Sequence, residues 1–326
     1  MNATSPPRVV ALGGGHGLAA TLIALREITP DITAIVTVAD DGGSSGRLRQ
    51  EFGVLPPGDL RMALAALAGE GDRDATWRGV LQHRFASGGD LHGHAVGNLL
   101  IVALWQVMGD ATEALDWVAR LLGVQGRVLP MSKVPLEVEA DITRVLDGQE
   151  WHTTVHGQRR VAVAGGRVDA IRLIPSEPPA CPEAVAALGE ADWIVFGPGS
   201  WYTSVIPHLL VPGLAHAVAQ SPARRAVTLN LAPQHGETQG YTAADHLAAL
   251  HSYAPGIDFD VVIVDPSAVE DLAALSVLAA TRGGQVLVRR VRAADGSPSH
   301  DPRALAGAYR DGFADGDRNR LLEERG

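Results

Sequence analysis

The sequence has very few of the residues that several classes of enzyme depend on. Cys181 is the only cysteine among 326 residues, which excludes an internal disulfide, a zinc site built on cysteine pairs and a CxxC redox motif. Lys133 is the only lysine and does not follow a glycine run, so a Walker P-loop is excluded. Arginine must therefore supply most of the cationic chemistry.

Long apolar runs and an excess of basic charge are also missing. The longest apolar runs, such as residues 191–196, fall far short of the roughly 20 residues that span a bilayer. The first residues lack the basic and apolar regions of a secretory signal, so we expect a cytoplasmic protein without membrane insertion. The net charge of −10 leaves no basic stripe that could follow a nucleic-acid backbone, and no nucleic-acid partner is expected.

What the sequence does contain is an alternation of buried-strand and helical patterns. Residues 8–14 form an apolar run that ends in glycines, residues 17–28 have helical spacing, and residues 32–40 repeat the strand pattern. Further strands are expected at 191–197, 224–231 and 261–265, and helical stretches at 60–68, 95–108, 112–122, 205–219 and 243–253. This pattern predicts an α/β fold with a mostly parallel sheet and a helical block after the first βαβ unit.

Two segments depart from that alternation. Residues 134–175 read as short strands separated by Asp147-Gly148 and Gly165-Gly166, dipeptides typical of hairpins, and predict a small antiparallel β insertion. Residues 311–326 are charged with little periodicity and are expected to form a frayed tail. One ligand-binding domain over residues 1–310 is therefore expected.

Polar clusters follow four of the expected strands. They span residues 13–17, 40–49, 197–204 and 234–245. Because ligands of open parallel sheets bind outside the carboxyl ends of the strands, these clusters are expected to share one crevice.

The first cluster is a glycine-rich turn from Gly13 to Gly17. Its backbone amides, at the start of a helix, predict a phosphate cradle, against the simpler interpretation of an ordinary tight turn. It does not match the dinucleotide fingerprint, because Leu18 stands where the last glycine is required.

The second cluster contains two neighbouring carboxylates, Asp40 and Asp41, which could accept hydrogen bonds from a ribose or hold Mg²⁺. Gly42 to Ser45 could form a mobile anion-binding loop, and Arg47 could contact phosphate oxygens in a bidentate manner, although a solvated loop would account for it equally well.

For other candidate positions, a purely structural role is the alternative to a chemical one. Asp59 is expected to cap a helix rather than to act chemically, with Arg61 in the first turn. His94 and Asn98 lie one helical turn apart and could line a polar pocket. The sequence has no GxSxG elbow, and no Ser/His/Asp or Cys/His set can be assembled.

The last two clusters offer hydroxyls and amides. Residues 197–204 begin a helix with Ser200, Tyr202, Thr203 and Ser204, which suit phosphate or sugar oxygens. Thr242 and Asp245 match a capping box, which leaves Gln234, Glu237, Thr238 and Tyr241 free to contact a ligand.

Taken in order, these motifs resemble the YvcK-type branch of the CofD-like family, the gluconeogenesis factors. The resemblance covers about residues 8–265 and rests on the strings GGGHGLAATL, TVADDGGSSGRLR, PPGDLR, HGHAVGNLL, FGPGSWYTSVIPHLL and NLAPQHGETQGYTAADH. His16, where threonine is frequent, and the segment LAPQ depart from the family pattern.

The resemblance implies a Rossmann-like fold with a doubly wound sheet that binds UDP-sugars such as UDP-N-acetylglucosamine. It implies a regulator of cell shape and cell-wall precursor supply during gluconeogenic growth, with protein partners in cell-wall synthesis, and it allows self-association. Catalysis and a required cofactor are not expected.

Two alternatives stay open: a Mg²⁺-dependent transferase of the 2-phospho-L-lactate type, with the metal on Asp40 and Asp41, and an NAD-binding protein. The expected ligand-binding residues are Gly13, Gly14, Gly15, His16, Gly17, Asp40, Asp41, Gly43, Ser44, Ser45, Arg47, Asp59, Arg61, His94, Asn98, Gly197, Gly199, Ser200, Tyr202, Thr203, Ser204, Asn230, Gln234, Glu237, Thr238 and Tyr241.

Overall fold

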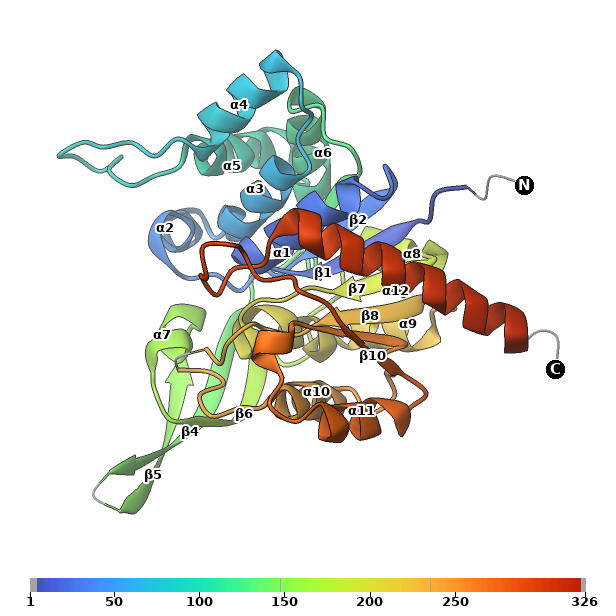
Figure 1. Cartoon of the computed structure of the whole chain (residues 1–326). Coiled ribbons are helices and arrows are strands. Elements are labelled where there is room, and N and C mark those ends of the chain that lie inside the picture. The colour runs from blue at the N-terminus through green and yellow to red at the C-terminus, as the bar shows by residue number, and fades with distance from the viewer. Residues whose placement is uncertain (1–4, 147, 235, 324–326) are drawn as a thin grey trace.

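Seven parallel strands form the central sheet of the protein (Figure 1). The structure, a computed structural model, describes residues 5–146, 148–234 and 236–323. The strand order is β10-β9-β8-β7-β1-β2-β3. The strands are β1 (Val9–Gly13), β2 (Ile32–Val36), β3 (Arg127–Pro130), β7 (Trp193–Phe196), β8 (Arg224–Thr228), β9 (Val261–Val264) and β10 (Gln285–Val288). The expected α/β, Rossmann-like fold is confirmed.

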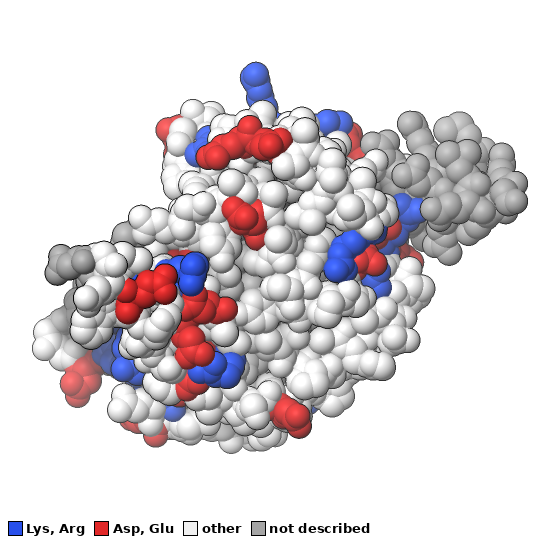
Figure 2. All heavy atoms as spheres, turned by 90° about the horizontal axis from the view of Figure 1, so that it is seen from below, with Lys and Arg blue, Asp and Glu red and all other residues white. Residues whose placement is uncertain are grey.

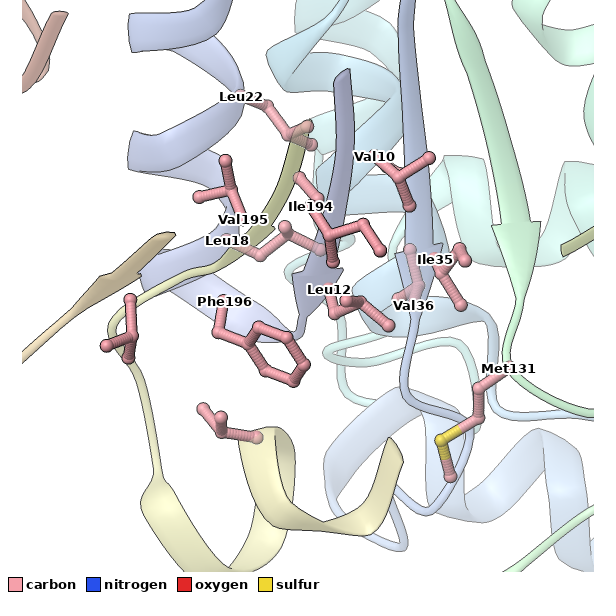
Figure 3. Close-up of a cluster of buried hydrophobic side chains, with 14 of the residues drawn as sticks. Val10, Leu12, Leu18, Leu22, Ile35, Val36, Met131, Ile194, Val195 and Phe196 are labelled. Atoms are coloured by element: carbon pink, nitrogen blue, oxygen red, sulfur yellow. The ribbon is translucent and has the colours of Figure 1, made fainter. Parts of the chain in front are cut away.

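The strands form here because their side chains are apolar on both faces. Every residue of β1, β7 and β9 is buried, as expected for strands covered by helices on two sides. Figure 3 shows Leu12 and Ile194 in the sheet, with Leu18 and Leu22 of the following helix packed against them. The carboxyl ends of β1 and β7 are thereby held side by side.

Helices cover the two faces of this sheet. One face carries α1 (Gly15–Arg26), α3 (Pro57–Ala66) and α12 (Pro302–Glu323). The other carries α8 (Pro182–Glu190), α9 (Pro212–Gln220), α10 (Ala243–Tyr253) and α11 (Leu272–Ala280). The helical block is completed by α2 (Gly43–Phe52), α4 (Asp72–Gln82), α5 (Val96–Met108) and α6 (Ala111–Leu121).

The antiparallel insertion lies between β3 and β7 in the chain. It consists of β4 (Glu137–Leu146), β5 (Gln149–His156), α7 (Gln158–Val163) and β6 (Arg167–Ile174), with strand order β5-β4-β6. The Gly165-Gly166 hairpin prediction is wrong, because this dipeptide joins α7 to β6. The other predicted turn includes Asp147, which lies outside the described residues.

Two further expectations about local structure are wrong. The polar stretch after β2 contains the helix α2 rather than a continuous mobile loop. Residues 311–323, expected as a frayed tail, continue α12. Phe313 of this helix stacks on Trp193, with ring centroids 4.3 Å apart, so the helix is packed on the sheet beyond residue 310.

Charged groups of both signs are interspersed on the face shown in Figure 2, without a continuous basic band. Lys133 lies 3.0 Å from Asp110 and 2.8 Å from Glu183. None of the helices in the described part of the chain combines the length and the apolar character that crossing a membrane would require.

Candidate functional site

A cleft opens where the order of the strands reverses. From β1 the chain builds the sheet outward through β2 to β3, and after the insertion it returns to the other side of β1 with β7. Such a switch point is the place where open α/β sheets bind ligands. The cleft has a volume of about 350 Å³ and is lined by Gly14, Gly15, His16, Gly17, Asp40, Asp59, Gln158, Gly199, Ser200, Ser204 and Gln234.

The two glycine loops of the cleft touch each other. A Cβ atom on Gly17 would lie 1.9 Å from the carbonyl oxygen of Pro198, and one on Gly14 would lie 2.6 Å from Asp59 Oδ2. A side chain at position 17 would push the two loops apart, and one at position 14 would displace Asp59 and Thr37. Glycine is therefore required for the two strand ends to close around one cavity.

The first loop presents the start of α1 to the cleft. Gly14 has extended backbone and no side chain to cap the helix. The N–H groups of a first helical turn have no intrahelical partner, and here that of Gly15 hydrogen-bonds Asp59. Gly15 has φ of +58°, a conformation that glycine adopts without strain. The amides of His16 and Gly17, with the positive end of the helix dipole, suit a phosphate group.

The second loop is different, and here one expectation is wrong. Its backbone amides were predicted to bind phosphate, yet side chains of the chain itself already occupy them. Gly199 N–H donates to Asn230 Oδ1 at 2.9 Å and Trp201 N–H to Gln234 Oε1 at 3.1 Å. The amides of Gly197 and Ser204 donate to backbone carbonyls. This loop therefore offers the hydroxyls of Ser200 and Ser204 to the cleft, and few amides.

Glu237 and Thr238 hold this loop from behind rather than facing the cleft. Glu237 is buried and accepts hydrogen bonds from Tyr202 N–H at 2.8 Å and Thr203 Oγ1 at 2.7 Å. Thr238 is fully buried, and its Oγ1 accepts from Gln234 N–H at 2.8 Å. The expectation that both are free to contact ligand is wrong. Their neighbour His235 lies outside the described residues.

Tyr202 and Tyr241 lie at a separate groove. Their hydroxyl oxygens are 2.6 Å apart, and both residues line a cavity between β6 and α10. Neither lines the cleft at the end of β1. The structure therefore separates these tyrosines from the glycine loop with which they were grouped.

Two carboxyl groups share the cleft. Burial and, after it, the nearby charge of Asp40 raise the pKa of Asp59 to about 7, against the opposing effects of Gly15 N–H and Arg61. Burial also raises the pKa of Asp40, with Asp41 adding to the shift. The role of Asp59 as a helix cap is contradicted, since α3 has no side-chain cap and begins after Pro56. Near neutral pH the carboxyl group of Asp59 is therefore protonated for part of the time.

Asp41 does not join this pair. Its Oδ1 accepts a hydrogen bond from Arg159 N–H at 2.9 Å, in the first turn of α7. This contact directs Asp41 toward the insertion, whereas Asp40 lines the cleft. The predicted pairing of Asp40 with Asp41 at one ligand is wrong, and Asp59 takes the second position.

The residues of α2 were predicted as an anion-binding loop, and they belong to the helical block instead. Ser44 lies 3.0 Å from His94 Nδ1 and accepts from Asn98 Nδ2 at 3.0 Å. Arg47 donates to the carbonyls of Asp90 at 3.0 Å and His92 at 2.6 Å. These polar groups stabilise the packing of α2 on α5, and Arg47 is not at the cleft.

Other predicted residues take supporting positions. Ser45 hydrogen-bonds Asp40, Gly43 begins α2 with φ of +49°, and Gly13 accepts from Thr37 N–H through its carbonyl at 3.0 Å. Arg61 donates from Nε to Asn98 Oδ1 at 2.8 Å, which links it to the network of Ser44 and His94. None of these residues lines the cleft.

Sequence reasoning missed Gln158, the first residue of α7. Its Nε2 donates to Thr203 O at 3.1 Å and to Ser204 Oγ at 3.4 Å, and the residue lines the cleft. No motif marks it, because the insertion brings it to the site from a distant part of the sequence.

Comparison with known proteins shows the family of the chain. The family described as 2-phospho-L-lactate transferase CofD matches residues 9–282. The chain belongs to the CofD-like family. A protein of Mycobacterium tuberculosis is 49% identical over 302 residues, which are 91% of this chain and 88% of that protein. The Bacillus subtilis protein named gluconeogenesis factor is 40% identical over 265 residues, covering 81% of this chain and 80% of that one.

A solved structure also matches. The crystal structure of a UPF0052 family member from Bacillus halodurans superposes with a TM-score of 0.83 at 35% identity, covering 94% of this chain and 99% of that chain. The resemblance to the CofD-like family expected from the motifs is confirmed.

The CofD-like family resemblance implies a magnesium ion for its transferase branch. Among the described residues, no group of three or more His, Cys, Asp and Glu side chains could hold a metal ion. Mg²⁺ is commonly bound by one or two carboxylates together with substrate phosphates. Asp40 and Asp59, both at the cleft, fit such a site, whereas Asp41 does not.

Proposed function

We propose that this chain is a regulatory protein that binds a UDP-sugar, such as UDP-N-acetylglucosamine or UDP-glucose, in the cleft between β1 and β7. The single observation that supports this most is the uncapped start of α1 inside the cleft. Its amides suit the diphosphate, because a helix start carries partial positive charge and unpaired donors.

The remaining lining residues suit the neutral parts of such a ligand. Ser200, Ser204 and Gln158 offer hydroxyl and amide groups, which recognise sugar hydroxyls by hydrogen bonds. The name of the B. subtilis relative, gluconeogenesis factor, is consistent with a role in growth on gluconeogenic carbon sources. On this proposal the bound state controls cell-wall precursor supply and cell shape in the cytoplasm through a protein partner.

Isothermal titration calorimetry of the full chain tests the proposal. UDP-N-acetylglucosamine and UDP-glucose are expected to bind at one site per chain, and UMP, which lacks the diphosphate, is expected to bind at least ten-fold more weakly. Failure of both UDP-sugars to bind would refute the proposal. Binding of NAD in preference to both would favour the dinucleotide alternative.

A second candidate function is transfer of a phosphoryl-linked group with Mg²⁺. The observation that favours it is the carboxyl pair of Asp40 and Asp59 at the cleft, together with the CofD family match. Mg²⁺ would polarise the phosphoryl oxygens when bound. Turnover of a diphosphate substrate that disappears in Asp59→Asn, while nucleotide still binds, would establish it, and the absence of turnover with Mg²⁺ would remove it.

A further inference from the structure

A second cavity adjoins the cleft and is separated from it by His16, which lines both. We call it the arginine cavity. It has a volume of about 700 Å³ and is lined by His16, Ala19, Ile23, Arg61, Met62, Ala65, Ala66, Ala75, Arg78, Gly79, Gln82 and Arg84. These residues come from α1, α3, α4 and the segment after α4.

The arginine cavity is basic in an acidic protein. Its lining contains three arginines and no aspartate or glutamate, although the chain has a net charge of −10. Four other cavities of the protein, the cleft among them, each have at least one acidic residue in their walls. Among the described residues, no carboxylate lies within salt-bridge distance of Arg61, Arg78 or Arg84.

Two of these arginines are held in place by the fold. The stem of Arg61 lies against Gly97, where a Cβ atom would be 2.8 Å from Arg61 Cδ, and its Nε donates to Asn98 Oδ1. Arg84 donates from Nη1 to the carbonyl of Gly93 at 2.9 Å. Burial, assisted by the charge of Arg84, lowers the pKa of Arg61 to about 10. Like charges are thus brought together in a wall without carboxylates, while the charge of Asp59, which lines the neighbouring cleft, opposes the shift of the Arg61 pKa.

Such an arrangement is stabilised by an anion. Guanidinium groups bind phosphate and carboxylate through paired charge-assisted hydrogen bonds. The rest of the wall is apolar, with Ala19, Ile23 and Met62 among its residues, so the ligand carries a small apolar body beside its charged group.

We propose that the arginine cavity binds the phosphate or carboxylate group of a small metabolite, independently of the nucleotide-sugar cleft, with His16 as the wall between them. The same protein would then bind two different metabolites, one in each cavity. Only this joint occupancy depends on the proposed function, whereas anion binding to the arginines does not.

Titration of the full chain with inorganic phosphate and, separately, with sodium acetate tests the proposal. Chloride keeps the ionic strength constant in both. At least one of the two anions is expected to bind saturably at one site per chain, and the anion that binds identifies the group. The double variant Arg78→Gln/Arg84→Gln is expected to weaken that binding at least ten-fold. Arg73→Gln, an exposed arginine of the same helix outside the cavity lining, is the matched control and is expected to bind within two-fold of the natural sequence.

Repeating the titration with saturating UDP-N-acetylglucosamine decides between two sites and one. Unchanged anion binding supports separate sites, whereas competition would overturn the proposal by making the cavity part of the nucleotide-sugar site. Absence of saturable binding of either anion, or equal binding by the double variant, would also overturn it. If the UDP-sugar does not bind at all, the anion titrations alone still decide whether the arginine cavity binds an anion.

Discussion

Asp59 is the residue whose ionisation has the largest predicted effect on the cleft. Its pKa is raised to about 7, so its carboxyl group is mostly neutral at pH 6 and mostly charged at pH 8. A charged Asp59 beside the start of α1 repels an anionic ligand. We expect UDP-sugar affinity, measured by calorimetry in buffers without divalent cations, to fall about ten-fold from pH 6 to pH 8.

Asp59→Asn should abolish most of that pH dependence, because the amide stays neutral throughout. Asp41→Asn is the matched control and should retain it, since Asp41 contacts α7 and not the cleft. An affinity that stays constant with pH in the natural sequence would contradict the assignment of the raised pKa to Asp59.

The same ionisation affects stability. The folded-state pKa of Asp59 lies above its ordinary value of 3.8, so the folded chain binds more protons than the unfolded chain between these two values. The free energy of unfolding therefore decreases as pH rises from 4 to 7 and levels off above 7. In urea titrations at pH 8, Asp59→Asn is expected to be more stable than the natural sequence by about 2 kcal/mol. A variant that is less stable at pH 8 and equally pH-dependent would refute this.

For single residues, the sequence predicts which polar groups reach the cleft better than it predicts which of them lie next to each other. Gly14, Gly15, Gly17, Ser200 and Gln234 were expected at the site and line the cleft. Asp40 and Asp41 look like a pair because they are adjacent, but Asp41 accepts a hydrogen bond from Arg159 N–H of α7 while Asp40 lines the cleft. The partner of Asp40 comes from α3, and only the packed fold brings it there.

Among the elements, α1 and the loop after β7 depend on each other through Gly17. A methyl group there would clash with the Pro198 carbonyl at 1.9 Å. Gly17→Ala is expected to lower the free energy of unfolding by about 3 kcal/mol and to weaken UDP-sugar binding, as measured by urea unfolding and calorimetry. Gly189→Ala, a helical position with nothing within 4 Å of the added Cβ, should instead gain about 0.5–1 kcal/mol. Equal effects of the two substitutions would show that the close contact of the loops is unimportant.

The short helix α7 connects the insertion to the cleft through Gln158. Gln158→Ala removes the hydrogen bonds to Thr203 O and Ser204 Oγ without leaving a buried cavity. UDP-sugar affinity should fall about five-fold, or by ~1 kcal/mol, while the urea midpoint changes little. Arg160→Ala, an exposed position of α7 that does not line the cleft, is the control. An unchanged affinity in Gln158→Ala would mean that α7 plays no part in binding.

Elements with strong apolar patterns were predictable, and short or polar ones were not. The runs that became β1, β2, β7 and β9 were identified because both of their faces are apolar. The helix α2 was missed because its sequence, GSSGRLRQEF, is rich in glycine and polar residues, and packing of Leu48 and Ser44 outweighs its weak propensity.

For the whole molecule, α12 closes one face of the sheet. Phe313 is 6% exposed and stacks on Trp193. Phe313→Ala is expected to lower the free energy of unfolding by about 3 kcal/mol, as measured by urea unfolding. Val277→Ala is the control, since Val277 is 65% exposed and its truncation should change stability by less than about 0.5 kcal/mol. If Phe313→Ala also lowers the free energy of unfolding by less than about 0.5 kcal/mol, the chain folds without help from this helix.

The charged composition of residues 311–326 indicated a tail, because the buried apolar residues of α12, such as Leu305, Tyr309 and Phe313, lie mostly before residue 311. The strand order likewise could not be predicted from the sequence pattern. It depends on β7 returning to β1 across the insertion, a long-range pairing that local patterns do not encode. The sequence did predict that ligand-binding residues gather at one edge of the sheet, because open parallel sheets bind ligands at the carboxyl ends of their strands.

The reversal of strand order has a dynamic consequence. The two parts of the sheet, β1–β3 and β7–β10, are joined by the backbone hydrogen bonds between β1 and β7. A molecule held between the loops after β1 and β7 crosslinks these parts without touching most of either. Binding of this molecule should therefore slow amide hydrogen exchange in both parts of the sheet, including amides far from the atoms that it contacts. A ligand in a small cleft would in this way make the whole sheet more rigid.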